Sequence, residues 1–192
     1  KVTTGRNNVD IAHGQIEKKT GDVSSQPQMA LDVASLGGMY AGKIRLVGTE
    51  TGVGVRNAGH IGAQAGAVTL TADGRIENSG SISAKTDVHL ATTRELHNSG
   101  SVYAGQDTQI QSNGVFTHTG SVASRHNTRI QTARLTGGER SLLAAGVKDD
   151  GRLAAAGNLT VSTTGELAAH GQVLSGGDMQ LKGQGLDLSN SR

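Results

Sequence analysis

A five-residue pattern returns four times in this chain, at steps of 21, 20 and 20 residues. Each copy reads glycine, any residue, a β-branched aliphatic residue, any residue and a small residue. The copies begin at Gly59, Gly80, Gly100 and Gly120. A fixed period near 20 residues with alternation inside it is typical of a coil of short strands that completes one turn per repeat. The pattern therefore predicts a solenoid.

Each repeat divides into three short segments in which apolar residues lie two positions apart. A spacing of two places these residues on one face of a strand and their mostly polar neighbours on the other. Equivalent segments resemble one another between repeats, whereas successive strands of an antiparallel sandwich would differ. We therefore predict an all-β fold, a parallel β-helix (solenoid) with ~20-residue turns of three short strands that rise about 4.8 Å per turn. The inward residues are Ile61, Ile82, Val102 and Val122 in the first segment, Val68, Leu70, Val88, Leu90, Thr108, Ile110, Thr128 and Ile130 in the second, and Ile76, Leu96 and Phe116 in the third.

The composition agrees with a narrow core. The chain has 29 glycines and one proline, and its only aromatic residues are Tyr40, Tyr103 and Phe116. A globule of 192 residues normally needs more large side chains, but a solenoid core is a thin column of stacked Val, Ile, Leu and Ala. Disorder would also explain the Gly, Ser, Thr and Asn content, yet disordered segments lack ordered apolar columns.

The regularity defines two regions. Residues 1–36 are predicted to be an irregular start of the coil, with an exposed loop from Glu17 to Pro27, and residues 37–192 the regular β-helix. We assign Gly151 and Gly171 to the starts of the last two turns. The step from Gly120 to Gly151 is 31 residues, so an insertion or an extra partial turn is expected within 133–150. It could be a helical turn beside the coil, or a first strand near Leu142 and Ala144.

Two columns are expected to have structural roles. Asparagine at a repeated bend can accept left-handed geometry and can hydrogen-bond to its copies above and below. The glycines at the start of each turn are predicted to adopt a positive φ that a Cβ would penalise. The predicted structural ladder is Asn57, Asn78, Asn98 and His118, and the turn glycines are Gly59, Gly80, Gly100, Gly120, Gly151 and Gly171.

We predict no catalytic, metal or cofactor residues. Glycosidases need paired carboxylates at a set separation, and the acidic residues fall on loops and outward faces where we expect no stacking between adjacent turns. They are Asp73, Glu77, Asp87, Glu95, Asp107 and Asp178, with Asp149–Asp150 as the one adjacent pair. None of the seven histidines repeats at ligand spacing with a second histidine on its face, and cysteine is absent. The glycines are turn residues rather than phosphate cradles.

Charge and hydropathy disfavour two kinds of partner. The net charge is +2 and no run of Lys or Arg forms a basic stripe, which argues against nucleic acid. No apolar stretch approaches the roughly 20 residues of a membrane helix, so no membrane insertion is expected. No secretion signal opens the chain, which is expected of either a cytosolic protein or a piece of a longer exported one.

Residues 37–50, GGMYAGKIRLVGTE, and 52–59, GVGVRNAG, carry a specific resemblance. They resemble the filamentous haemagglutinin family of two-partner-secreted exoproteins, which includes adhesins and the stalks of contact-dependent growth-inhibition toxins. The later repeats and residues 137–153 are similar to the haemagglutinin repeats of that family, so the resemblance covers about residues 28–192. It implies a right-handed β-helix, export through an outer-membrane two-partner secretion pore, and display at the bacterial cell surface.

We therefore expect a structural filament segment of a large secreted exoprotein that presents an adhesive or toxin-delivering tip to other cells. The full-length protein would contact a receptor or glycan of the target cell. The alternative is a polysaccharide-binding or polysaccharide-cleaving β-helix, and a groove lined by acidic residues would favour that alternative.

Overall fold

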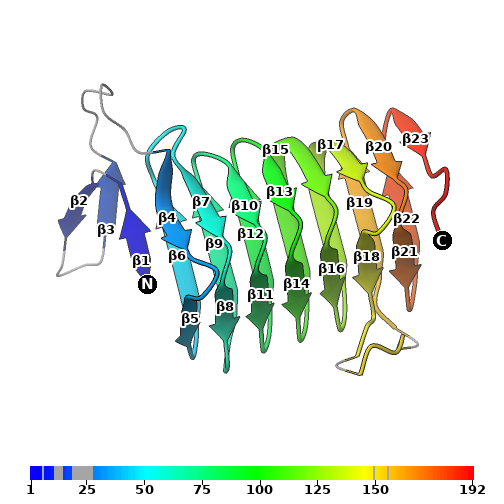
Figure 1. Ribbon diagram of the computed structural model, residues 1–192, viewed down its shortest axis with the longest axis horizontal. Coiled ribbons are helices and arrows are strands. Elements are labelled where there is room, and N and C mark those ends of the chain that lie inside the picture. Colours follow the sequence, from blue (N-terminus) through cyan, green and yellow to red (C-terminus); the bar gives the residue numbers. More distant parts are fainter. Residues whose placement is uncertain (6, 11–14, 19–27, 149, 155) are drawn as a thin grey trace.

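The computed structural model describes residues 1–5, 7–10, 15–18, 28–148, 150–154 and 156–192. These residues form strands and loops but no helix, and none of their segments meets the requirements of a membrane-spanning helix. Most strands stack in parallel into a solenoid of about eight turns, which stand side by side along the long axis of the molecule in Figure 1. The predicted all-β parallel solenoid is confirmed.

The first strands of the turns form one face, a sheet of seven parallel strands. Ile61, Ile82, Val102 and Val122 lie opposite one another in this sheet. Like residues therefore stack on like residues from turn to turn. The seven strands are β5 (Gly38–Ala41), β8 (His60–Ala63), β11 (Ser81–Ala84), β14 (Ser101–Ala104), β16 (Ser121–Ser124), β18 (Leu142–Ala145) and β21 (Gln172–Ser175).

The second and third strands form a continuous sheet of 14 strands, because β15 (Thr108–His118) and β17 (Thr128–Gly137) run through the bend between them. The other second strands are β1 (Val2–Thr4), β6 (Ile44–Gly48), β9 (Val68–Ala72), β12 (Val88–Thr92), β19 (Leu159–Thr163) and β22 (Met179–Lys182). The other third strands are β4 (Met29–Val33), β7 (Gly54–Asn57), β10 (Ile76–Asn78), β13 (Leu96–Asn98), β20 (Glu166–Ala169) and β23 (Gly185–Asp187).

The core lies inside the three faces. Leu70, Leu90, Ile110 and Ile130 form one column whose side chains are 0% exposed. Each buried aliphatic side chain of this size stabilises the fold by roughly 1.5–3 kcal/mol. The column is continuous because every turn supplies one such residue at the same position.

The amino-terminal region, predicted as the irregular start of the coil, contributes strands to it. Strand β1 pairs in parallel with β6, and β4 pairs in parallel with β7, so residues before 37 already belong to the stacked turns. Strands β2 (Asn7–Asp10) and β3 (Gln15–Lys18) form an antiparallel hairpin. Of the loop predicted from Glu17 to Pro27, residues 17 and 18 belong to β3, and residues 19–27 lie outside the described part of the chain.

The extra residues of the longest turn follow β18. This strand pairs with β16 and aligns Leu143 with Val122. Of the two alternatives for this region, the first strand near Leu142 and Ala144 is therefore the one that forms. The added loop covers 146–158 and contains an antiparallel bridge between Val147 and Leu153. It begins inside the interval 133–150 and extends beyond it.

Candidate functional site

The three asparagines of the predicted ladder point into the core on consecutive turns. The Nδ2 of Asn57 donates to Oδ1 of Asn78 at 2.8 Å, and the Nδ2 of Asn78 donates to Oδ1 of Asn98 at 2.7 Å. The same nitrogens also donate to the carbonyl oxygens of Ser81 and Ser101. Each amide therefore ties its own turn to the next at two points.

His118 continues this Asn/His ladder (Asn57, Asn78, Asn98 and His118). Its Nδ1 lies 3.2 Å from Nδ2 of Asn98, and its Nε2 lies 3.0 Å from the carbonyl oxygen of Leu142. A ring protonated at Nε2 alone satisfies both contacts, because Nδ1 then accepts and Nε2–H donates. The imidazole thus supplies one acceptor and one donor where an amide would otherwise stand. Gly137 is its partner on the next turn and has no side chain, so the ladder ends there.

The surroundings of His118 favour its neutral form. The side chain is 0% exposed, and this burial lowers its pKa below the usual value of 6.5, although the hydrogen bonds with Leu142 and Asn98 oppose the shift. The ring also packs against Phe116, with ring centroids 5.3 Å apart. A proton on Nδ1 would face the donor Nδ2 of Asn98 and would break the ladder.

The other end of the ladder is incomplete. The residue opposite Asn57 on the preceding turn is Val33, which has no donor in its side chain. Among the described residues, Oδ1 of Asn57 is buried without a hydrogen-bond partner. An unsatisfied buried acceptor costs about 1–3 kcal/mol, so the first position of the ladder is its weakest.

The turn glycines are required for a different reason from the one predicted. Among the described glycines, positive φ angles occur at Gly5, Gly52, Gly146, Gly151 and Gly157, and not at Gly59, Gly80, Gly100, Gly120 or Gly171. The backbone carbonyl of the preceding turn lies so close that a Cβ at Gly80, Gly100 or Gly120 would collide with it. The expectation of a positive φ is therefore wrong in this column. Glycine is required there because the backbones of two adjacent turns approach too closely to leave room for a Cβ.

Gly151 does not belong to the column. Strands β16, β18 and β21 align Ser141 between Gly120 and Gly171, so Ser141 holds the position assigned to Gly151. Gly151 instead lies in the added loop, at a φ of +79°, and its N–H donates to the carbonyl oxygen of Lys148. A left-handed turn in a short loop is the ordinary place for a glycine.

A second ladder was missed by the sequence reasoning. Its five residues immediately precede β12, β15, β17, β19 and β22, and the side-chain oxygen of each of the first four accepts the backbone N–H of the same position one turn later. The expectation that acidic residues do not stack is thus wrong for Asp87 and Asp107, because both carboxylates are used to hold adjacent turns together. Asp or Asn directly before the second strand of five consecutive turns was the available signal. The members are Asp87, Asp107, Asn127, Asn158 and Asp178.

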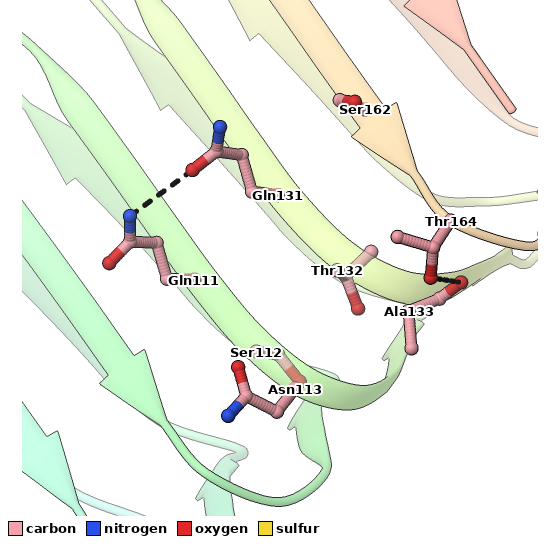
Figure 2. A pocket seen from close by; sticks show the side chains of 8 residues that line it. All are labelled: Gln111, Ser112, Asn113, Gln131, Thr132, Ala133, Ser162 and Thr164. Carbon is pink, nitrogen blue, oxygen red and sulfur yellow. Dashed lines mark hydrogen bonds between the residues drawn. The ribbon is translucent and has the colours of Figure 1, made fainter.

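A hollow in the described surface lies at the bend between the second and third strands. Its volume is about 530 Å³. Figure 2 shows Gln111 and Gln131 side by side on neighbouring strands, with the Nε2 of Gln111 donating to Oε1 of Gln131 at 3.1 Å. The floor is formed by Ser112 and Thr132, whose hydroxyls donate to carbonyl oxygens of the preceding turn. The remaining residues of the hollow are Asn113, Ala133, Ser162 and Thr164.

This hollow continues along the coil as a polar groove. An adjoining hollow of about 330 Å³ shares Gln111 and Asn113 with it and reaches back to Gly48. Amides and hydroxyls dominate the lining, and Asp73, the charged residue of the adjoining hollow, accepts hydrogen bonds from the hydroxyls of Thr51 and Thr93. The groove can therefore exchange hydrogen bonds with a ligand. None of the eight residues in Figure 2 has a side chain that titrates near neutral pH.

In the part of the chain that the structure describes, no three His, Cys, Asp or Glu residues lie close enough together to hold a metal ion. The Nε2 of His170 lies 3.1 Å from Oδ2 of Asp187. Hydrogen bonds from Ser189 and His170 lower the pKa of Asp187 to about 2. Of the predicted acidic pair, Asp149 lies outside the described residues, and Asp150 lies beside Arg152.

Comparison with known proteins gives consistent results over the whole chain. The haemagglutinin-repeat family matches residues 2–92, 79–147 and 147–191. A protein named Toxin CdiA from Yersinia pestis is 48% identical over 191 residues, which is 100% of this chain and 6% of that protein. A tRNA nuclease CdiA-2 from Burkholderia pseudomallei (strain 1026b) is 52% identical over 165 residues, 86% of this chain and 5% of that protein. The chain thus spans a small part of the length of these relatives. No solved structure matches it.

Proposed function

The chain belongs to the haemagglutinin-repeat family, and from that premise we propose that it is a structural rod segment of a large exported bacterial surface protein. The rod would hold an adhesive or toxin-delivering tip away from the cell that makes it. The observation that carries this proposal is the parallel stacking of the turns, in which the strands of both solenoid sheets pair with their copies on the neighbouring turns. Such a coil lengthens in proportion to the number of turns, by about 4.8 Å each.

The carboxy-terminal turn supports a longer rod. Met179 and Leu186 are 45% and 53% exposed, whereas their partners on the preceding turn, Leu159 and Leu167, are 0% exposed. Apolar side chains that continue an inward column gain most of their stabilisation when another turn covers them. We propose that further repeats stack on this face in the parent protein.

We propose that any toxic activity of the parent protein resides outside this segment, and that the segment itself is not an enzyme. The relatives named as a toxin and a tRNA nuclease share only 6% and 5% of their length with it. The polar groove offers amides and hydroxyls but no pair of carboxylates for acid–base chemistry. Asp87 and Asp107 are engaged with the backbone of the next turn.

The parent protein would reach the cell surface through an outer-membrane two-partner secretion pore, and it would bind a receptor or glycan of the contacted cell. The chain suits passage through a pore because it has no cysteine and because its contacts are made between neighbouring turns. A secreted or surface location follows from this proposal.

The rod proposal can be tested by changing the number of turns. Residues 80–119 make up two whole turns, since Gly80 and Gly120 hold equivalent positions. Duplicating this segment four times should lengthen the rod by about 40 Å, as measured by small-angle X-ray scattering, and should leave contact-dependent inhibition by the parent protein intact. Duplicating residues 80–109, which ends in mid-turn, is the control and should disrupt folding. A longer molecule that is no more elongated would contradict the proposal.

The polar groove favours a second candidate function, the binding of an extended neutral polysaccharide. Its hydrogen-bonding side chains recur once per turn, which suits a ligand that also repeats. The test is a nuclear magnetic resonance titration with a neutral oligosaccharide such as a dextran oligomer. Gln111→Ala with Gln131→Ala should abolish binding, whereas Gln109→Ala, on the same strand but outside the groove, should not. Unchanged binding in the double variant would exclude the groove.

A further inference from the structure

A smaller hollow of about 360 Å³ lies at a different bend, between first and second strands. We call it the cationic notch, and it differs from the polar groove because charged side chains border it. Its residues come from three consecutive turns. Those that matter below are Lys85, Tyr103, Gly105, Gln106, Arg125 and His126.

The notch exists because one turn lacks a side chain. Strands β11, β14 and β16 align Ala84, Ala104 and Ser124, so the residues that follow them, Lys85, Gly105 and Arg125, hold equivalent positions. Lys85 and Arg125 are thus two turns apart, about 10 Å along the coil, with only Gly105 between them. A Cβ at Gly105 would collide with the carbonyl oxygen of Lys85. The backbone approach therefore keeps the space between the two cations open.

The two cations are available to a ligand. Both side chains are exposed, and within the described residues neither makes a hydrogen bond or an ion pair. The carboxylates nearest in sequence, Asp87 and Asp107, accept hydrogen bonds from the backbone of the next turn. The positive charge at the notch is therefore not paired internally.

The backbone of the notch offers no donors of its own. The N–H groups of Gly105 and Arg125 donate to the carbonyl oxygens of Ala84 and Ala104, and that of His126 donates to Gln106. Recognition must therefore come from side chains. Besides the two cations, the Gln106 amide and the His126 ring border the hollow.

Tyr103 fixes one wall of the notch. It is half-buried, and its hydroxyl donates to the carbonyl oxygen of Val147 at 3.2 Å. Val147 belongs to the loop 146–158, so the extra residues of the longest turn reach back to hold this ring. An aromatic ring anchored by its polar end presents an apolar surface beside hydrogen-bonding groups.

We propose that the cationic notch binds a sugar that carries an oxyanion. The oxyanion lies between Lys85 and Arg125, because a guanidinium and an ammonium both form charge-assisted hydrogen bonds with phosphate or carboxylate oxygens. The sugar ring lies against Tyr103, and the amide of Gln106 bonds to its hydroxyls. The binding strengthens at low salt, because the two cations are exposed.

Three sugars with the same ring test this proposal. Glucose 6-phosphate, glucuronate and glucose differ only at carbon 6, which bears a phosphate ester in the first, is the carboxylate carbon in the second and bears a hydroxyl in the third. In a nuclear magnetic resonance titration of the 192-residue chain, glucose 6-phosphate should bind most tightly, because a phosphate ester carries about −1.5 to −2 charges. Glucuronate should bind more weakly, and glucose should not bind. The Nε–H of Arg125 should shift while that of Arg129 stays unchanged.

Variants separate the parts of the site. Lys85→Gln with Arg125→Gln should weaken binding of glucose 6-phosphate at least about tenfold, whereas Arg129→Gln with Lys182→Gln removes the same charge elsewhere and should have a small effect. Tyr103→Leu should weaken glucose 6-phosphate but not inorganic phosphate. Equal binding of glucose, an unaffected double variant, or no binding to the native chain would each overturn the proposal. An unaffected Tyr103→Leu variant would overturn the role of the sugar ring.

Discussion

Asn98 and His118 are joined across adjacent turns by a hydrogen bond in which an imidazole nitrogen accepts from an amide. This contact requires the neutral ring, and it closes a series of bonds that begins at Asn57. The only titratable side chain of the Asn/His ladder is therefore the one at which the ladder ends.

Acidification should destabilise the fold through His118. Because burial lowers its pKa, the folded chain binds fewer protons than the unfolded chain below about pH 6.5, so the free energy of unfolding falls as the pH falls. This contribution is complete above the unfolded pKa and is lost from there down to the folded pKa, by at most about 1.4 kcal/mol per pH unit. Denaturant titrations of the native chain and of His118→Asn should diverge below pH 6.5. Parallel pH profiles would contradict the neutral-ring assignment.

Removing the middle of the ladder should be costly. Asn78→Ala removes one of the two acceptors of the Nδ2 of Asn57 and the ladder donor to the Oδ1 of Asn98, so we expect a loss of about 2–4 kcal/mol in the free energy of unfolding. Asn113→Ala, an exposed asparagine of the polar groove, is the control and should cost under about 0.5 kcal/mol. Chemical denaturation measures both. Similar losses would show that the ladder contributes little.

Two adjacent residues of β12 test which side chains of this strand face the core and which face outward. Leu90 is fully buried and His89 points outward. Leu90→Ala should cost about 2–4 kcal/mol, because it leaves a cavity in the core column, and His89→Ala should cost under about 0.5 kcal/mol. The measurement is again the free energy of unfolding, and equal effects would mean that the strand phase is wrong.

The close approach at the turn glycines predicts a strong effect of a single methyl group. Gly100→Ala would place a Cβ against the carbonyl oxygen of Gly80, and we expect a loss of about 2–4 kcal/mol. Gly185→Ala is the matched control, because no atom lies within 4 Å of its added Cβ. If the Gly100→Ala protein has the same melting temperature as the native chain, close approach of the backbones does not explain the glycines of this column.

Covering the carboxy-terminal turn should stabilise the chain. Met179 and Leu186 lie exposed on inward columns, and the edges of β22 and β23 can recruit other strands. Appending the next native turns should raise the melting temperature and suppress end-to-end association in sedimentation experiments. If the longer chain is no more stable and the 192-residue chain stays monomeric at high concentration, the exposed turn needs no cover.

The period of the sequence was sufficient to predict the solenoid, because stacking in parallel register repeats the same residue types at the same step. The predicted ladder residues Asn57, Asn78, Asn98 and His118 do lie on consecutive turns and bond to one another. The tautomer of His118 and the unsatisfied Oδ1 of Asn57 could not be predicted, because they depend on Leu142 and Val33, which lie far away in the sequence.

Other features depend on distances that a linear pattern does not contain. A glycine that is needed for a positive φ and a glycine that is needed for a close approach of two backbones give the same sequence pattern. Only the distance between adjacent turns in the structure distinguishes these two reasons. Gly151 was misplaced because Gly151 and Leu153 imitate the repeated pattern, while Ser141 stands where the pattern has glycine. The polar groove and the cationic notch arise where small residues at a bend leave space, and neither has a motif.

The hydrogen bonds of the Asn/His ladder all point in one direction, from each Nδ2 toward the carboxy-terminal neighbour. Each asparagine of the ladder therefore directs an N–H toward the turn on its carboxy-terminal side. On its amino-terminal side each asparagine presents an acceptor, and the first of these, Oδ1 of Asn57, meets Val33, which has no donor in its side chain. The ladder is thus unequal at its two ends: its amino-terminal end leaves a buried acceptor unused, whereas at its carboxy-terminal end His118 meets a backbone carbonyl oxygen, that of Leu142.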